Sequence, residues 1–237
     1  MTTSDGFTAA LDALERSGHL SERYVEPFVT FLPVTGASIS TLGGVLGNET
    51  ISASDAHAAR LDEAQFDVGE GPCWDAMRSA APIAEPALRA EGAARWPAFA
   101  AAVQHEPVSS IFAFPLIVGP LKIGAVDLYS QDPVALDPGA NQRATALADV
   151  VGRHILRAAL ATASADDDAD LNPRTRRTVH QATGVVLAQL QISPDDALVM
   201  IQAHAFASGQ SVMEVAGEIV EGRLRFRRSL GRIEVTP

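Results

Sequence analysis

The stretch 174–222 constrains the fold more than any other part of the chain, because local signals divide it into three short helices. Each helix starts either at a polar N-cap residue followed by proline, or at a capping box in which Ser and Glu bond to the backbone. Ser208 and Gly209 end the second helix, since glycine is favoured just after a helix C-terminus. The start signals are Asn172-Pro173, Ser193-Pro194 and Ser211-Val212-Met213-Glu214.

Apolar residues in this stretch recur at spacings of three and four, which predicts three amphipathic helices packed as a bundle. Several facing positions are alanine, so the helices can approach closely. Gly184 in mid-helix costs about 1 kcal/mol relative to Ala, which indicates that something packs or binds there. Because so small a bundle buries little apolar area, we expect it to dimerise. The expected interior positions are Val179, Ala182, Val186, Leu190, Ala197, Ile201, Ala205, Val212, Val215, Ala216 and Ile219.

Charge is unevenly distributed along the chain. The net charge is −11, yet the part from Asn172 onward has eight arginines against six acidic residues, which leaves ten basic and 23 acidic residues before it. Basic clusters attract nucleic-acid phosphates, and we expect the first and third helices to bring the two arginine clusters onto one side. Without such a partner they would be an ordinary solvated surface. The clusters are Arg174, Arg176 and Arg177, and Arg223, Arg225, Arg227, Arg228 and Arg232.

The three-helix pattern resembles the ANTAR domain, a family of RNA-binding transcription antiterminators, over roughly the last 60 residues. Thr183 stands where that family often has Lys or Arg. The resemblance implies binding to paired RNA hairpins with small loops, whose unstacked bases are accessible to a protein. The pattern is Arg176-x-x-Val179-x-Gln181-Ala182-x-Gly184, Ala197-x-x-x-Ile201-x-x-x-Ala205 and Val215-Ala216-x-x-Ile219-Val220. The candidate RNA contacts are Arg174, Arg176 and Arg177, which would contact phosphates or base faces. Gln181 and Thr183 would make polar contacts from the same helix, and His204 would stack on or bond to a base.

The first two thirds of the chain predict an antiparallel sheet flanked by helices. Glycine and proline at 69, 71 and 72 predict an irregular loop over 67–76. We expect helices within 5–33 and at 54–65, 96–105 and 137–162, strands at 37–42, 49–53 and 83–84, and a hairpin of 109–118 with 121–130. The expected organisation is a first domain at 1–162, an acidic linker at 163–172, a helical domain at 173–230 and a tail at 231–237.

This first part resembles the GAF domains that precede ANTAR in actinobacterial regulators. The resemblance rests on the GEGPCWDA stretch from Gly69, the Trp96-Pro97 helix start, and the strands containing Phe114-Pro115-Leu116 and Ile123 to Tyr129. It implies an α+β fold in which a GAF domain precedes an all-α ANTAR domain, and a small-molecule pocket between the sheet and adjacent helices. The signatures of the cyclic-nucleotide and bilin-binding subtypes are absent, so the ligand stays unknown. Candidate pocket residues are Phe66, Cys73, Trp74, Phe114, Asp127 and Tyr129.

Several chemistries are not expected. The single cysteine, Cys73, rules out an internal disulfide and fits a reducing cytoplasm, and we expect it to be a small buried hydrophobe rather than a reactive thiolate. GAF domains that reduce free methionine sulfoxide use more than one cysteine. No metal-ligand spacing, phosphate-binding loop, membrane-spanning run or leader sequence is found. We therefore expect a cytoplasmic protein that is not an enzyme.

The favoured function is a signal-responsive RNA-binding regulator that prevents transcription termination. The runner-up is a ligand-binding GAF protein whose C-terminal bundle only dimerises or docks a protein partner. DNA recognition is a weaker third hypothesis, because the second helix has no Arg or Lys to read a major groove. The apolar face of helix 137–162 is broad, which predicts a second dimer surface and a route for the signal.

Overall fold

A computed structural model describes residues 3–16, 24–42, 46, 48–164, 177–229 and 232–236. The chain forms two compact units, one of residues 1–66 with 70–170 and the other of residues 67–69 with 171–237. In the first unit, five antiparallel strands form one sheet in the order β2-β1-β5-β4-β3. The strands are β1 Gly36–Thr41, β2 Glu49–Ala53, β3 Ile83–Glu85, β4 Ser110–Val118 and β5 Leu121–Ser130. The mixed α+β class expected from the sequence is confirmed.

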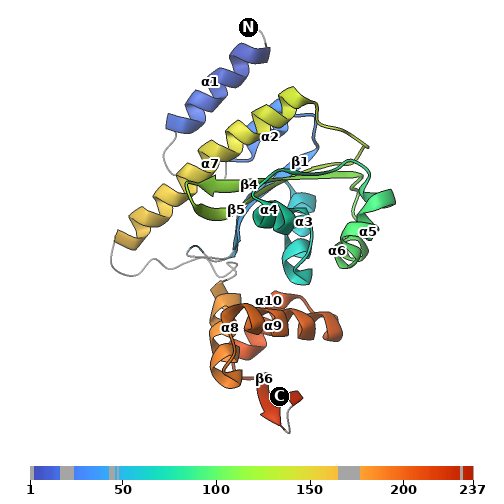
Figure 1. The fold of residues 1–237 in the computed structure, drawn as a ribbon, viewed down its shortest axis with the longest axis vertical. Coiled ribbons are helices and arrows are strands. Elements are labelled where there is room, and N and C mark those ends of the chain that lie inside the picture. The colour runs from blue at the N-terminus through green and yellow to red at the C-terminus, as the bar shows by residue number, and fades with distance from the viewer. Residues whose placement is uncertain are drawn as a thin grey trace. The chain divides into compact units, whose positions relative to one another are not determined.

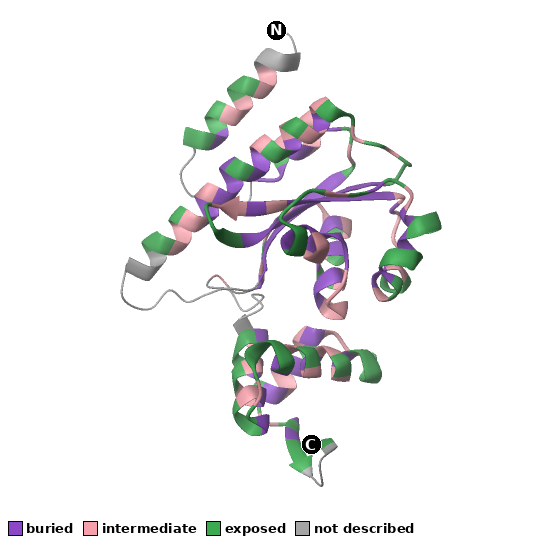
Figure 2. Cartoon of the chain, in the orientation of Figure 1, coloured by how far each residue is buried: buried purple, intermediate pink, exposed green. Residues whose placement is uncertain are grey.

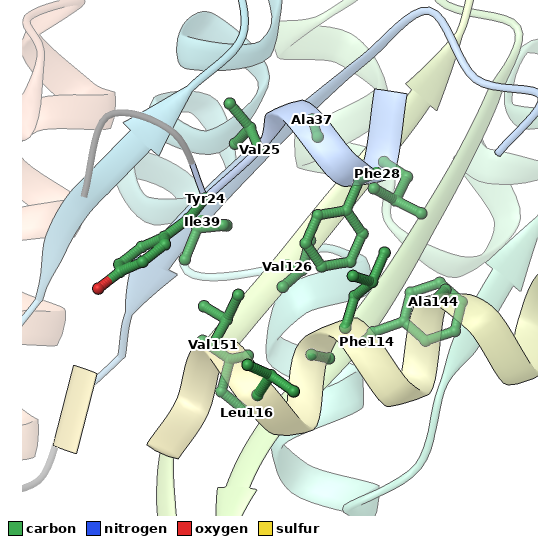
Figure 3. Packing of buried hydrophobic residues seen from close by; sticks show 14 of the residues in the cluster. Tyr24, Val25, Phe28, Ala37, Ile39, Phe114, Leu116, Val126, Ala144 and Val151 are labelled. Carbon is green, nitrogen blue, oxygen red and sulfur yellow. The ribbon is translucent and has the colours of Figure 1, made fainter. Parts of the chain in front are cut away.

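One face of the sheet carries the main apolar core. Helices α1 (Thr3–Arg16), α2 (Glu26–Phe31) and α7 (Pro138–Ser164) lie on this side (Figure 1). Phe28, Phe114 and Val151 meet between the helices and the sheet (Figure 3). The strands are mostly buried (Figure 2) because helices lie on both sides of the sheet.

The apolar face of α7 packs within the chain, and a dimer surface on this helix stays a prediction. Helix α7 buries Leu147, Val150 and Val151 against the sheet, and its flank is covered by α1 and α2 of the same chain. Leu160, near the C-terminal end of α7, is a large apolar side chain of this helix that stays exposed, at 60%. The apolar face of α7 is broad because it packs against the sheet on one side and against α1 and α2 on its flank.

Helices α3 (Ala56–Val68) and α4 (Pro72–Ser79) lie on the opposite side of the sheet (Figure 1). The loop predicted over 67–76 is wrong in its second half, because α4 begins at Pro72. Proline at the first helical position starts a helix instead of breaking it. Gly71 has a φ of +139°, and a Cβ there would lie 2.6 Å from Gln65 Oε1. The irregular segment is thus a short turn between two helices.

Between β3 and β4 the chain forms three short helical segments. They are the π-helix η3 (Leu88–Gly92), α5 (Ala93–Arg95) and α6 (Pro97–Ala102). The sequence predicted the start of α6 at Trp96-Pro97 but neither η3 nor α5. The buried side chains of Leu88, Trp96 and Phe99 anchor this connection.

The second unit contains the three predicted helices, α8 (Arg177–Leu190), α9 (Pro194–Ser208) and α10 (Val212–Val220). Ser193 Oγ accepts a hydrogen bond from the Asp196 backbone N–H, and Ser211 with Glu214 forms the expected capping box. All eleven positions expected in the interior are buried. The start signal Asn172-Pro173 lies outside the described residues.

A C-terminal hairpin follows the three helices, with its first strand inside the predicted helical domain and its second strand in the predicted tail. Strands β6 (Arg225–Ser229) and β7 (Arg232–Thr236) pair antiparallel. The second arginine cluster therefore lies largely on a β-ribbon and not on the third helix, so this region is not all-α. The two-residue alternation of Arg225, Phe226 and Arg227 is the sequence signal that predicts such a strand.

No single described helix is long and apolar enough to cross a bilayer. Thr178–Leu190 and Pro194–Ser208 reach that length and composition only together, and a 105° bend separates them.

Candidate functional site

One face of α8, which we call the open face, is exposed and carries small side chains at two of its positions. Gln181, Gly184 and Ala188 are all exposed, and their spacing of three and four places them on one helix face. A Cβ added at Gly184 would meet no described atom within 4 Å. Nothing in the described bundle therefore packs on this backbone, and a partner can approach it closely.

Of the predicted RNA contacts on and before α8, Gln181 is exposed, Thr183 is half-buried and the arginine side chains lie outside the described residues. Arg174 and Arg176 lie outside the described residues, as does the side chain of Arg177, the first residue of α8. Gln181 is exposed on the open face of α8. Thr183 is half-buried, and its hydroxyl donates to the Val179 carbonyl at 2.7 Å. That hydroxyl is thus already engaged within its own helix.

His204 on α9 has an internal contact that the sequence did not predict. Its ring meets Phe226 of β6 edge-on, with centroids 5.9 Å apart. Phe226 is 1% exposed, and its backbone N–H donates to Gln189 Oε1 of α8 at 2.8 Å. His204 therefore helps to hold the hairpin on the bundle.

Five of the six predicted pocket residues come from the α3–α4 side of the sheet. Phe66 is on α3, Cys73 and Trp74 are on α4, and Asp127 and Tyr129 occupy alternate positions of β5. Phe114 does not join them, because its side chain enters the core on the α7 side (Figure 3). Strand alternation separates it from the others, since neighbouring strand positions face opposite sides.

A buried hydrogen-bond network centred on Gln65 links these elements. Gln65 Nε2 donates to Asp127 Oδ2 at 2.7 Å, and Gln65 Oε1 accepts from the Cys73 backbone N–H at 2.8 Å. Trp74 Nε1 donates to the Gln65 carbonyl at 2.8 Å. Gln65 is fully buried, so it joins α3, α4 and β5 inside this region. Its burial was not expected from the sequence, because a polar residue in a helix gives no sign of burial by itself.

Asp62 forms a second buried polar centre on α3. Its carboxylate accepts hydrogen bonds from the hydroxyls of Ser40 on β1 and Thr50 on β2. Nearby, the Tyr129 hydroxyl donates to Asp55 at 3.0 Å. Burial, together with this bond to Asp55, raises the pKa of Tyr129 to about 12. Tyr129 therefore stays neutral and acts as a hydrogen-bond donor.

The part of the chain that the structure describes contains a cavity of about 320 Å³ away from these residues. It is formed by the connection between β3 and β4, and none of the six predicted pocket residues lines it. Its lining is largely apolar and comes from Leu88, Arg89, Ala93, Pro97, Ala100, Ala101, Val103, Gln104 and Val108.

A charged cluster joins α3 to the segment before β4. Arg60 Nε donates to Glu106 Oε1 at 2.7 Å, and His57 Nδ1 lies 2.7 Å from Glu106 Oε2. The hydrogen bond from Arg60 has the largest effect, and together with the one to His57 it lowers the pKa of Glu106 to about 2. No group of three or more potential metal ligands occurs among the described residues.

Residues 169–220 match the ANTAR domain family. The C-terminal helical region is an ANTAR domain. The match begins in the predicted acidic linker and ends with α10, so the β6–β7 hairpin lies beyond it. Among curated proteins, none matches this chain.

The GAF domain of an Acinetobacter phosphoenolpyruvate-protein phosphotransferase is similar to the N-terminal part. The two share a TM-score of 0.50 and 12% identity over 69% of this chain and 96% of that domain, which shows the GAF fold. The nlh2 GAF domain of A. Aeolicus has a TM-score of 0.46 and 15% identity, covering 65% of this chain and 96% of that one. A type II free methionine-R-sulfoxide reductase from Thermoplasma acidophilum has a TM-score of 0.45 and 14% identity, covering 62% and 96%.

Proposed function

We propose that this chain is an RNA-binding regulator whose ANTAR domain binds structured RNA and whose GAF-fold domain controls that binding in response to a small molecule or state. The observation that carries the proposal is the ANTAR domain at 169–220. The RNA is a pair of hairpins with small loops, and its capture prevents a competing terminator from forming. The protein acts by binding and not by catalysis, in keeping with the 1% exposure of Cys73.

The open face of α8 suits such a ligand. Gln181 offers both a donor and an acceptor to base edges, while Gly184 and Ala188 let a nucleic-acid backbone or base come close to the helix. Unstacked loop bases can use this face, whereas the deep major groove of an A-form stem cannot admit a helix. Arg174, Arg176 and Arg177 are the proposed phosphate contacts at its N-terminal end.

The test places a negative charge on the open face of α8. Gly184→Glu in the full chain should weaken binding to a two-hairpin RNA by about tenfold or more, because a carboxylate repels phosphates at close range. Ala203→Glu, at an exposed position of α9, makes the same change in net charge and serves as the control. Fluorescence anisotropy with labelled RNA gives both affinities. Equal affinities for the two variants would exclude the α8 face as the binding surface.

The arginines before α8 make a separate test. Arg176→Ala with Arg177→Ala should weaken RNA binding and lower the slope of log affinity against log salt by about 1.4 to 1.8 if both contact phosphates. An unchanged slope would remove these residues from the interface.

DNA remains a weaker candidate ligand, since α9 has no Arg or Lys between Pro194 and Ser208. Dimerisation or protein docking through the bundle is the second candidate function. Val199 and Phe206 favour it, because they are 59% and 76% exposed and lie two turns apart on one face of α9. Light scattering of wild type and of Val199→Ser with Phe206→Ser tests this function. A dimeric wild type that binds no RNA, together with a monomeric variant, would favour the second function.

A further inference from the structure

The β6–β7 hairpin extends the chain beyond the ANTAR domain, and Phe226 is the buried apolar side chain among its described residues. A two-stranded hairpin is marginally stable alone in water, so this one depends on its attachment to α8 and α9. That attachment consists of the buried Phe226 ring, its edge contact with His204 and the bond from its N–H to Gln189. The attachment places β6 near the C-terminal end of α8.

The anchor also determines where the arginines of β6 point. Arg225 and Arg227 flank Phe226, and successive strand residues face opposite sides. Since Phe226 faces the bundle, Arg225 and Arg227 face away from it, and both are exposed. Their Cα atoms lie about 7 Å apart along the strand. This places two arginine side chains on the outer face of the ribbon.

Within the part of the chain that the structure describes, neither arginine has an ion-pair partner, in contrast to several other arginines. Arg60 is bound to Glu106, and Arg223 pairs with Glu221 just before the hairpin. Arg225 and Arg227 form no ion pair with any described residue, although Glu234 lies opposite Arg227 in the ribbon. Paired guanidinium groups left free in this way bind phosphate well, because each offers a planar fork of donors.

We propose that the outer face of the β6–β7 hairpin is a second RNA-binding surface, on which Arg225 and Arg227 contact the phosphate backbone of a stem. This proposal rests on the proposed RNA-binding function. Helix α8 has 14 residues and is about 20 Å long. The hairpin therefore meets the RNA about 20 Å from the N-terminal turn of α8. It adds affinity without reading sequence, as phosphate contacts do.

The experiment uses the full chain and a two-hairpin RNA, measured by anisotropy at several salt concentrations. Arg225→Gln with Arg227→Gln should weaken binding about tenfold near physiological salt and lower the salt slope by about 1.4 to 1.8. Arg225→Lys with Arg227→Lys keeps both charges and should retain most of the affinity. Arg16→Gln with Arg157→Gln removes the same net charge from exposed positions on α1 and α7, and should leave binding unchanged.

The outcomes separate this proposal from the proposed function. Normal affinity and slope in the Arg225/Arg227 glutamine variant, with tight binding by wild type, would overturn the hairpin surface and leave RNA binding by the ANTAR domain standing. An equal loss in the Arg16/Arg157 control would also overturn the hairpin surface, because the effect would come from net charge alone. No RNA binding by wild type would overturn both proposals. Circular dichroism should show that all variants keep their helices, since exposed substitutions cost within about 0.5 kcal/mol.

Discussion

Gln65 and Asp127 are 62 residues apart in sequence, yet their side chains share a 2.7 Å hydrogen bond inside the GAF-fold domain. The same glutamine accepts a hydrogen bond from the backbone of Cys73. One buried amide thus fixes the relative positions of α3, α4 and β5. These are the elements that carry five of the six predicted pocket residues.

Removing this amide should destabilise the GAF-fold domain. Gln65→Leu keeps a similar volume but leaves the Cys73 N–H without its acceptor and takes one donor from Asp127, which should cost about 1–3 kcal/mol per buried group. Both tryptophans of the chain, Trp74 and Trp96, belong to this domain, so their fluorescence during urea unfolding reports on it selectively. Gln104→Leu, at an exposed position, is the control and should have little effect. A wild-type midpoint for Gln65→Leu would show that the network contributes nothing to stability.

Gly71 should tolerate alanine less well than Gly119 does. Both have positive φ, +139° and +59°. Alanine at Gly119 meets no described atom within 4 Å. Gly119→Ala should therefore lower the unfolding free energy only by the cost of the left-handed conformation, roughly 1–2 kcal/mol. At Gly71 the new methyl would also clash with the Gln65 amide, so the loss in unfolding free energy should be clearly larger. Tryptophan-detected urea unfolding compares the two, and equal losses would contradict the clash.

Glu106 should make the GAF-fold domain sensitive to acid. In the unfolded chain its pKa has the ordinary value of 4.5, whereas Arg60 and His57 lower it to about 2 in the folded protein. Below pH 4.5 the unfolded state takes up a proton that the folded state does not, so this stabilising contribution falls as the pH drops from 4.5 to about 2. Glu106→Gln cannot titrate. The difference in unfolding free energy between wild type and Glu106→Gln, followed by tryptophan fluorescence, should therefore shrink over this range. A constant difference would mean that the pKa is not lowered.

The buried alanines between the helices of the ANTAR domain should not tolerate larger side chains. Ala182 is fully buried, and Ala182→Leu should overpack the bundle at a cost of about 1–3 kcal/mol. Ala188→Leu adds the same volume on the exposed face of α8 and should cost little. Hydrogen exchange of α9 and α10 amides measures the effect within this domain, which has no tryptophan. Equal protection in the two variants would contradict close packing at Ala182.

Local residue patterns were sufficient for the architecture. The caps at Ser193 and Ser211 and the three- and four-residue spacing of apolar side chains predicted α9, α10 and the bundle interior, because these signals act within one or two turns of a helix. The apolar runs on either side of Gly119-Pro120 likewise predicted the central hairpin. The resemblance to the ANTAR and GAF families rests on specific residue motifs and their spacing, and the ANTAR match and the GAF fold agree with it.

Tertiary structure decided which side chains meet. Phe114 and Asp127 both lie in the central hairpin, but strand register places them on opposite faces of the sheet. The burial of Gln65 and the engagement of His204 by Phe226 depend on segments distant in sequence. The second arginine cluster was expected on the third helix, whereas it lies largely on the β6–β7 ribbon, where the anchoring of Phe226 determines which way Arg225 and Arg227 point. Composition and spacing therefore specify the elements, whereas long-range packing specifies which of their faces are available to a partner.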